Sequence, residues 1–282
     1  MPLGRFKLGR QCVSPEKSAD LLLSSYIDKP RLLEHFLGGE CPGASSWTAF
    51  PCPDGAAPKP DTDPLGNDVA GCCVFAAPGH YAKLIGQLVG CPTPVTSGMV
   101  LTEYADASGY DPTTGSGDNG FVIRDMMDLW RQHGLYGVAL DAYCKVDHKD
   151  QSETALALWL AGGLIGGYAL PLESKSQVDE QGNPDWFMPA AGWPDGRGPG
   201  TWGGHCILRT GESPYGRDGN SWGLPAHMTK SWHDECCDEL WMPVCSLWAL
   251  RNGRTPSGFA YADLLNDAFL LSLKGEVSAR GT

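Results

Sequence analysis

The sequence predicts an α+β fold in which helices come first along the chain and strands follow. Apolar residues at helical spacing dominate residues 67–163, whereas short β-rich segments between turn residues dominate 164–282. Hydrophobic residues make up 42% of the 282 positions, which is enough to bury a substantial core. We therefore expect one main domain over 67–282, with a helical half at about 67–163 and a strand-rich half at about 164–282.

Four helices are expected in the first half, at residues 73–89, 98–104, 119–133 and 153–160. The first is a run of small and apolar residues typical of a buried helix, although Pro78 lies in its early part. Ser97 and Ser152 are the candidate N-terminal caps of the second and fourth helices. Gly134 follows the third helix as a stop signal.

The second half favours strands at residues 164–170, 205–209, 240–244 and 246–250. Thr229 is expected to cap a short helix that ends at Cys236. Residues 262–273 are amphipathic, and their periodicity fits a helix or a strand. Residues 1–66 look irregular, with much Pro, Gly and Asp toward their end. We interpret them as an arm that wraps over the main domain and substitutes for a propeptide.

Charge and hydropathy exclude two classes of partner. The formal net charge of −12 argues against nucleic acid, because phosphate contacts need clustered Lys and Arg. The longest apolar stretch, 156–170, is short and broken by glycines, so no membrane span is expected. The N-terminus has basic residues with no apolar run behind them, which predicts no secretory signal.

Three segments carry residues suited to nucleophilic catalysis: NDVAGCCVFAA (67–77), GGHCILRTG (203–211) and GNSWG (219–223). A thiol attacks only as thiolate, and a helix N-terminus beside an imidazolium lowers its pKa. Cys73 would open the buried helix, and His205 after two glycines leaves room for a partner to approach. A carboxamide such as Asn220 could hold the far nitrogen of that histidine.

These segments resemble the papain-like cysteine proteases. That family has a glutamine six positions before the nucleophile and a glycine two before it, then a Gly-His segment and an Asn-Ser-Trp-Gly motif. Asn67 and Gly71 occupy the first two places here, and residues 220–223 match the last motif in full. The resemblance implies a helical subdomain packed against an antiparallel sheet or barrel-like subdomain, with the cleft between them. It implies Cys73, His205, Asn220 and Asn67 as catalytic residues.

The chain departs from the family pattern in three places. Asn67 is shorter by one methylene than the glutamine whose amide helps to hold the oxyanion, and such a donor is worth about 3 kcal/mol when well placed. Val74 replaces the usual Trp after the nucleophile, and Cys72 is a neighbouring thiol. The spacing from Asn67 and Gly71 favours Cys73 over Cys72.

A looser likeness is to papain-like proteins of phages and prophages, in stretches such as GYDPTTGSGDNG (109–120) and DLWRQHGLYG (128–137). It implies that the protein acts in the host cytoplasm or the phage virion. Two functions follow as hypotheses. One is a cysteine peptidase or amidase that binds a peptide or other amide in the cleft. The other is a virion or capsid-associated protein that contacts phage structural proteins and keeps the fold with little or no catalysis.

Each of these residues also has a structural interpretation. Without catalysis, Cys73 would be a small buried core residue, and His205 would lie at the edge of the core with its ring bonded to a carbonyl. Asn220 would simply be a turn residue. Only their order along the chain favours catalysis. A second set of residues, His227, His233, Cys236 and Cys237, raises the question of zinc. Their spacing is poor for a single ion, so we expect no metal and no cofactor.

Overall fold

The computed structural model is described for residues 3, 6–11, 22–23, 45–46, 50, 52–250, 252–255 and 257–266. The helices are α3 (Cys73–Val89), α4 (Ser97–Ser108), α5 (Ile123–His133), α6 (Gln151–Ala161) and α7 (Lys230–Cys236). The longer strands are β4 (Leu140–Lys145), β5 (Leu164–Leu170), β7 (Gly203–Glu212), β8 (Gly216–Ser221), β9 (Leu224–Thr229) and β10 (Cys237–Cys245). The short strands are β1 (Arg10–Gln11), β2 (Ser45–Ser46), β3 (Phe121–Val122) and β6 (Asp185–Trp186).

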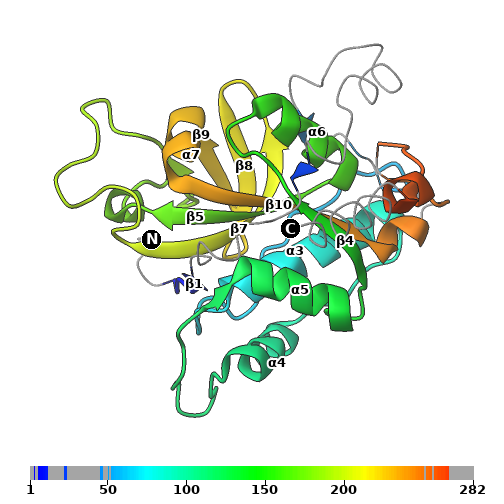
Figure 1. The fold of residues 1–282 in the computed structure, drawn as a ribbon. Coiled ribbons are helices and arrows are strands. Elements are labelled where there is room, and N and C mark those ends of the chain that lie inside the picture. Colours follow the sequence, from blue (N-terminus) through cyan, green and yellow to red (C-terminus); the bar gives the residue numbers. More distant parts are fainter. Residues whose placement is uncertain are drawn as a thin grey trace, which may run out of the picture.

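One eight-stranded sheet organises the molecule, in the order β4-β10-β5-β7-β8-β9-β6, with β2 added to β7. Its pairs are antiparallel except for β6 with β9. In Figure 1, α3, α4 and α5 gather below the sheet, and α7 lies beside the β8–β9 hairpin. The α+β expectation is confirmed. Among the described residues, β4 and β6 are the two edge strands and do not pair with each other, so the sheet is open rather than barrel-like.

Helix α3 begins and ends at the predicted residues. It tolerates Pro78 in its second turn and is buried along almost all of its length. Gly90 ends it in a left-handed conformation, with its N–H bonded to the carbonyls of Gln87 and Gly86. α4 and α6 are capped one or two residues earlier than predicted, by Thr96 and Asp150.

The strand predicted at 246–250 is wrong. These residues form a 3₁₀ helix, because β10 already ends at Cys245 after pairing with β4 and β5. Strand β4 lies within the segment expected to be helical, and it pairs with β10 near the other end of the chain. The two halves are therefore interleaved.

The predicted short helix after Thr229 is confirmed as α7, with the Thr229 hydroxyl accepting from Trp232 N–H. Residues 261–266 are helical, and 267–273 lie outside the described residues.

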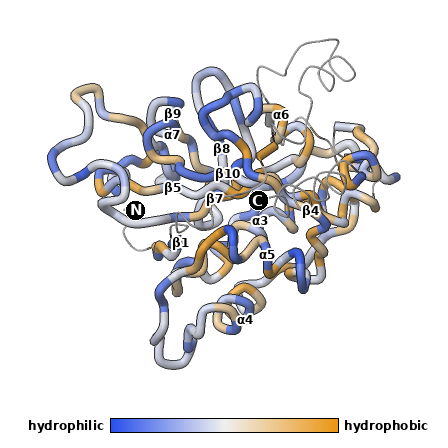
Figure 2. Tube along the Cα trace, viewed as in Figure 1, coloured by the Kyte–Doolittle hydropathy of each residue, from blue (hydrophilic) through white to orange (hydrophobic). Residues whose placement is uncertain are grey.

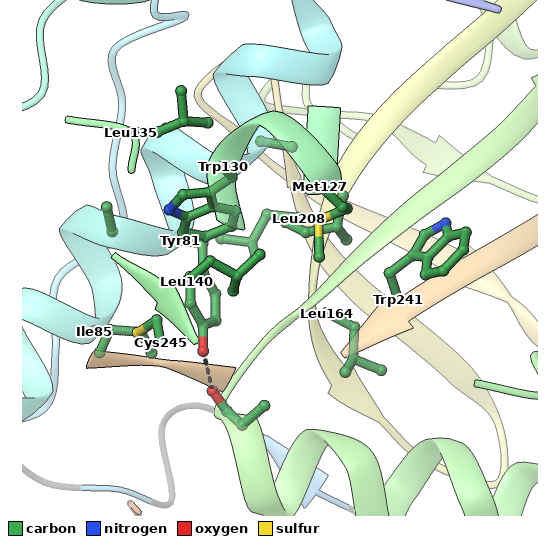
Figure 3. Packing of buried hydrophobic residues seen from close by; sticks show 14 of the residues in the cluster. Tyr81, Ile85, Met127, Trp130, Leu135, Leu140, Leu164, Leu208, Trp241 and Cys245 are labelled. Atoms are coloured by element: carbon green, nitrogen blue, oxygen red, sulfur yellow. Dashed lines mark hydrogen bonds between the residues drawn. The ribbon is translucent and has the colours of Figure 1, made fainter. Parts of the chain in front are cut away.

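The core has two parts, one on each face of the sheet. The larger lies between the sheet and α3, α5 and α6 (Figure 3). Within it, the buried Tyr81 hydroxyl donates to the carbonyl of Ala161, which satisfies a polar group that water cannot reach. The smaller part, on the opposite face, is rich in tryptophan and includes Trp186, Trp222 and Trp232. Figure 2 shows hydrophilic residues mainly on the outer loops and hairpins.

In the part of the chain that the structure describes, no helix is long and apolar enough to cross a bilayer. Most of the arm over residues 1–66 lies outside the described residues.

Leu164→Ala should destabilise the protein, because Leu164 is fully buried in the larger core. We expect the free energy of unfolding in urea to fall by about 2–5 kcal/mol. Leu250 is 58% exposed, so Leu250→Ala is the matched control and should change it by less than about 0.5 kcal/mol. Equal losses in the two variants would contradict this assignment of the core.

Candidate active site

Cys73 is the first residue of α3, which packs against β7. The side chain is 1% exposed, and its sulfur lies within reach of the backbone N–H groups of Cys206, Gly9 and Val74. Burial raises the pKa of the Cys73 thiol to about 11, although those N–H groups and the charge of Arg10 oppose the shift. The thiol is therefore protonated at neutral pH in this state.

The neighbouring Cys72 points elsewhere. Its thiol is buried and lies 3.7 Å from the carbonyl oxygen of Leu65, to which it donates. Burial raises the pKa of Cys72 well above the usual value for a thiol. Of the two adjacent sulfurs, only that of Cys73 approaches the backbone beside His205. The choice of Cys73 over Cys72 as nucleophile stays a prediction.

His205 lies on β7, next to the Cys206 N–H that reaches the Cys73 sulfur. Its ring stacks on Trp222 with centroids 4.2 Å apart, and Nε2 is 2.9 Å from the hydroxyl of Ser221. Nδ1 is buried and bonds to no described residue. Burial lowers the pKa of His205 to about 3, assisted by the charges of Arg10 and His80. The imidazole is therefore neutral, with one nitrogen fixed and the other free.

Asn220 does not make the bond that was expected of it. Its Nδ2 donates to the carbonyl of Asp61 at 2.7 Å, and its Oδ1 accepts from Gly223 N–H at 3.0 Å. The reason is the alternation of side chains along a strand. Asn220 pairs with Leu208, which faces α3, whereas Ser221 projects to the opposite face, where His205 lies. Ser221 was not predicted, although this alternation was a signal that could have identified it.

Asn67 is buried, and its amide donates to two backbone carbonyls, Ala70 at 3.0 Å and Lys7 at 3.3 Å. Both contacts are made within this chain. The oxyanion role drawn from its spacing to Cys73 stays a prediction.

Residues 6–11 pass between the segments that carry the candidate residues. Lys7 N–H donates to the carbonyl of Asn67 at 3.1 Å, and the Lys7 carbonyl accepts from Trp222 Nε1 at 3.0 Å. Phe6 stacks on Trp222 at 4.9 Å. The adjoining strand β1 pairs in parallel with β3, on the helical side. This stretch therefore bridges the two sides of the candidate site.

Residues 6–11 pack so closely against the segments that carry Cys73 and His205 that glycine is required at two points of contact. A Cβ on Gly9 would lie 1.6 Å from the carbonyl oxygen of Gly71, two residues before Cys73. A Cβ on Gly204 would lie 2.2 Å from the carbonyl oxygen of Arg10. Backbone thus packs directly on backbone at Gly71, two residues before Cys73, and at Gly204, the residue before His205.

Arg10 fixes this stretch in place. Its guanidinium is buried and forms ion pairs with Asp238 at 2.7 Å and Glu239 at 2.9 Å. The same positive charge disfavours an imidazolium at His205 and favours a thiolate at Cys73. Sequence reasoning placed an arm over the domain but did not identify Gly9 and Arg10 as its contacts.

The fold was compared with known proteins. No protein-family model and no curated protein sequence matches the chain. Among solved structures, the fold is similar to xylellain, a cysteine protease from Xylella fastidiosa, with a TM-score of 0.57 and 12% identity over 85% of this chain and 96% of that one. It is also similar to digestive procathepsin L2 proteinase from the larval midgut of Tenebrio molitor, with a TM-score of 0.53 and 10% identity over 86% and 79% of the two chains.

A second Tenebrio molitor structure, procathepsin L 3, gives a TM-score of 0.50 at 12% identity over 74% and 71% of the two chains. At these identities the likeness concerns the fold. The chain therefore has a papain-like α+β fold, with the helix that begins at Cys73 packed on the central strand that carries His205.

Proposed function

We propose that this protein is a cysteine hydrolase that cleaves a peptide or other amide bond, with Cys73 as nucleophile and His205 as base. One observation carries the proposal. His205 is held at Nε2 by Ser221, its buried Nδ1 bonds to none of the described residues, and the next residue, Cys206, has the N–H that lowers the pKa of the Cys73 thiol. A base needs one nitrogen fixed and the other available to accept a proton. The papain-like fold supports this chemistry.

In the proposed reaction, proton transfer from Cys73 to His205 generates the thiolate, which attacks the substrate carbonyl carbon. The backbone N–H of Cys73 and the amide of Asn67 stabilise the oxyanion. His205 then gives its proton to the leaving amine, and a thioester remains on Cys73. Water, deprotonated by His205, hydrolyses this thioester and restores the free thiol.

Ser221 is the positioning residue for His205 in this proposal, because its hydroxyl is the group bonded to Nε2. Asn220 acts indirectly in this proposal. Its side chain hydrogen-bonds to the Asp61 carbonyl and the Gly223 N–H, and so holds these two backbone segments at the end of β8. Its direct catalytic role remains a prediction from the sequence.

The described state is closed. Residues 6–11 cover Cys73 and His205, and both groups are neutral there, whereas attack requires a thiolate. We attribute to this stretch the function of a propeptide: substrate enters only after it has left. The departure would expose the sulfur to water and remove the main cause of its raised pKa.

Gly9→Ala should open the site, because its Cβ would overlap the carbonyl oxygen of Gly71. We expect the rate of Cys73 alkylation by iodoacetamide at pH 7 to rise by about two orders of magnitude, as the thiol pKa moves from about 11 toward about 8.5. Labelling of the parent protein should become fast only at alkaline pH. Gly98→Ala, with no atom nearer than 3.9 Å to its Cβ, is the control and should behave as the parent.

Cys73→Ala in the Gly9→Ala background should abolish both this labelling and the hydrolysis of a fluorogenic peptide library. Cys72→Ala in the same background should preserve both, because the Cys72 thiol faces Leu65. Mass spectrometry of the labelled peptide distinguishes the two sites. Labelling and hydrolysis that survive without Cys73 would refute the proposal. Labelling without any hydrolysis would favour the virion-protein alternative.

In the Gly9→Ala background, Ser221→Ala should slow Cys73 alkylation at neutral pH by about tenfold, since the lost hydrogen bond to His205 is worth about 1–1.5 kcal/mol. Ser221→Thr keeps the hydroxyl and should restore most of the rate. Asn220→Ala should have a smaller effect on the rate at the same pH, with folding checked by circular dichroism. A larger loss of alkylation rate in Asn220→Ala than in Ser221→Ala would indicate that the Asn220 carboxamide, not Ser221, orients His205.

A further inference from the structure

A cavity of about 600 Å³ lies between α3, the loop at residues 59–61 and strands β7, β8 and β9. Neither Cys73 nor His205 lines it, although Asn220 does, so it is distinct from the proposed Cys73–His205 pair. Its helical wall consists of His80, Leu84 and Gln87, which the 3.6-residue period places on one face of α3. This volume is in the range of small-molecule sites.

The inner wall contains a buried acid–histidine pair. His80 is 3% exposed, and its Nδ1 lies 2.8 Å from Oδ2 of Asp61, whose Oδ1 accepts from Lys83 Nζ at 2.6 Å. Burial alone would raise the pKa of Asp61, but the bonds from His80 and Lys83 lower it to about 2. The ionised carboxylate requires a proton on Nδ1, so Nε2 is the ring atom that this pair does not use.

Nε2 of His80 is not used by the fold. It bonds to none of the described residues, and the ring lines the cavity. A polar ring nitrogen this deeply buried, beside a cavity, is normally satisfied by water or by a ligand. The inner wall therefore offers an unused polar atom to a ligand.

The outer wall carries a row of acidic groups across three strands. His227 on β9 pairs in register with Asp218 on β8 and with Asp185 on β6. Its Nδ1 is 2.8 Å from Oδ1 of Asp218. The Asp185 carboxylate, which is partly buried, forms no hydrogen bond or ion pair with the described residues. It is available to a cation that enters the cavity.

The charges lining the cavity are unbalanced. Four aspartates line it, at positions 61, 179, 185 and 218, against one lysine, Lys59. Lys83 and His80 compensate only Asp61. Between the polar walls the lining is apolar, with Leu84, Leu208 and Pro225 among its residues. The combination suits a positively charged head group on an apolar body, and it disfavours an anion.

We propose that this cavity binds a small organic cation, an amine or guanidine with an apolar body. The cationic group lies by Asp185 and Asp218, and the apolar body packs on Leu84 and Leu208. A second polar group on the ligand bonds to Nε2 of His80.

The test uses three probes with one skeleton and different head groups: 4-phenylbutylamine, 4-phenyl-1-butanol and 4-phenylbutanoate. Binding to the full chain carrying Cys73→Ala is measured by calorimetry and ligand-observed NMR, so no turnover enters the readout. We expect the amine to bind most tightly, the alcohol more weakly and the carboxylate not at all, with the amine's affinity falling as salt rises. Absence of amine binding, or equal binding of amine and alcohol, would overturn the proposal.

Two variants locate the site. Asp185→Asn should weaken amine binding about threefold or more and leave alcohol binding unchanged, because it removes charge and keeps shape. Asp195→Asn is the charge-matched control, since Asp195 is exposed and does not line the cavity. Leu84→Trp should fill the space and abolish binding of both probes, with folding checked by circular dichroism. Amine binding that is unchanged in Asp185→Asn, or that survives Leu84→Trp, would place the ligand elsewhere and contradict the inference.

Discussion

The contact between the N-terminal end of α3 and strand β7 is the constraint on which the rest of the structure depends. It brings the Cys73 thiol to the backbone N–H of Cys206, the strand residue that follows His205, although these residues are far apart in the sequence. The facing side chains on β7 are Cys206 and Leu208, both buried in the larger core. The same hydrophobic contact that holds the helix to the sheet therefore also sets the position of the candidate nucleophile.

A second constraint is electrostatic. Burial raises the pKa of the Cys73 thiol and lowers that of His205, so each group favours its neutral form. An ion pair between them would be costly in so dry a site unless the charges were well solvated by hydrogen bonds. Arg10 adds to this effect at His205, and its own charge is compensated by Asp238 and Glu239. The closed state is thus stabilised by the same burial that suppresses the proposed chemistry.

The alternation of side chains along β7 and β8 places the proposed base and the proposed ligand cavity on opposite faces of one sheet. His205 and Ser221 project to one face, under Trp222. Leu208 and Asn220 project to the other, where they line the cavity beside α3. Asn220 links the two regions, because it ties the Asp61 backbone to the strand that ends in Ser221. A ligand in the cavity would therefore contact a residue adjacent to the one that holds His205.

The sequence by itself determined the α+β class, the bounds of α3 and β5, the short helix after Thr229, and the order of the segments that carry Cys73 and His205. These features depend on local periodicity, on caps and on runs of small residues, which act over a few positions. Only the tertiary structure decided that Ser221 rather than Asn220 bonds to His205, that residues 246–250 are not a strand, and that β4 joins the sheet. It also decided which backbone packs on Gly71 and Gly204. Each of these depends on strand register or on contacts between residues distant in sequence, and a one-residue shift in register exchanges the faces of a strand.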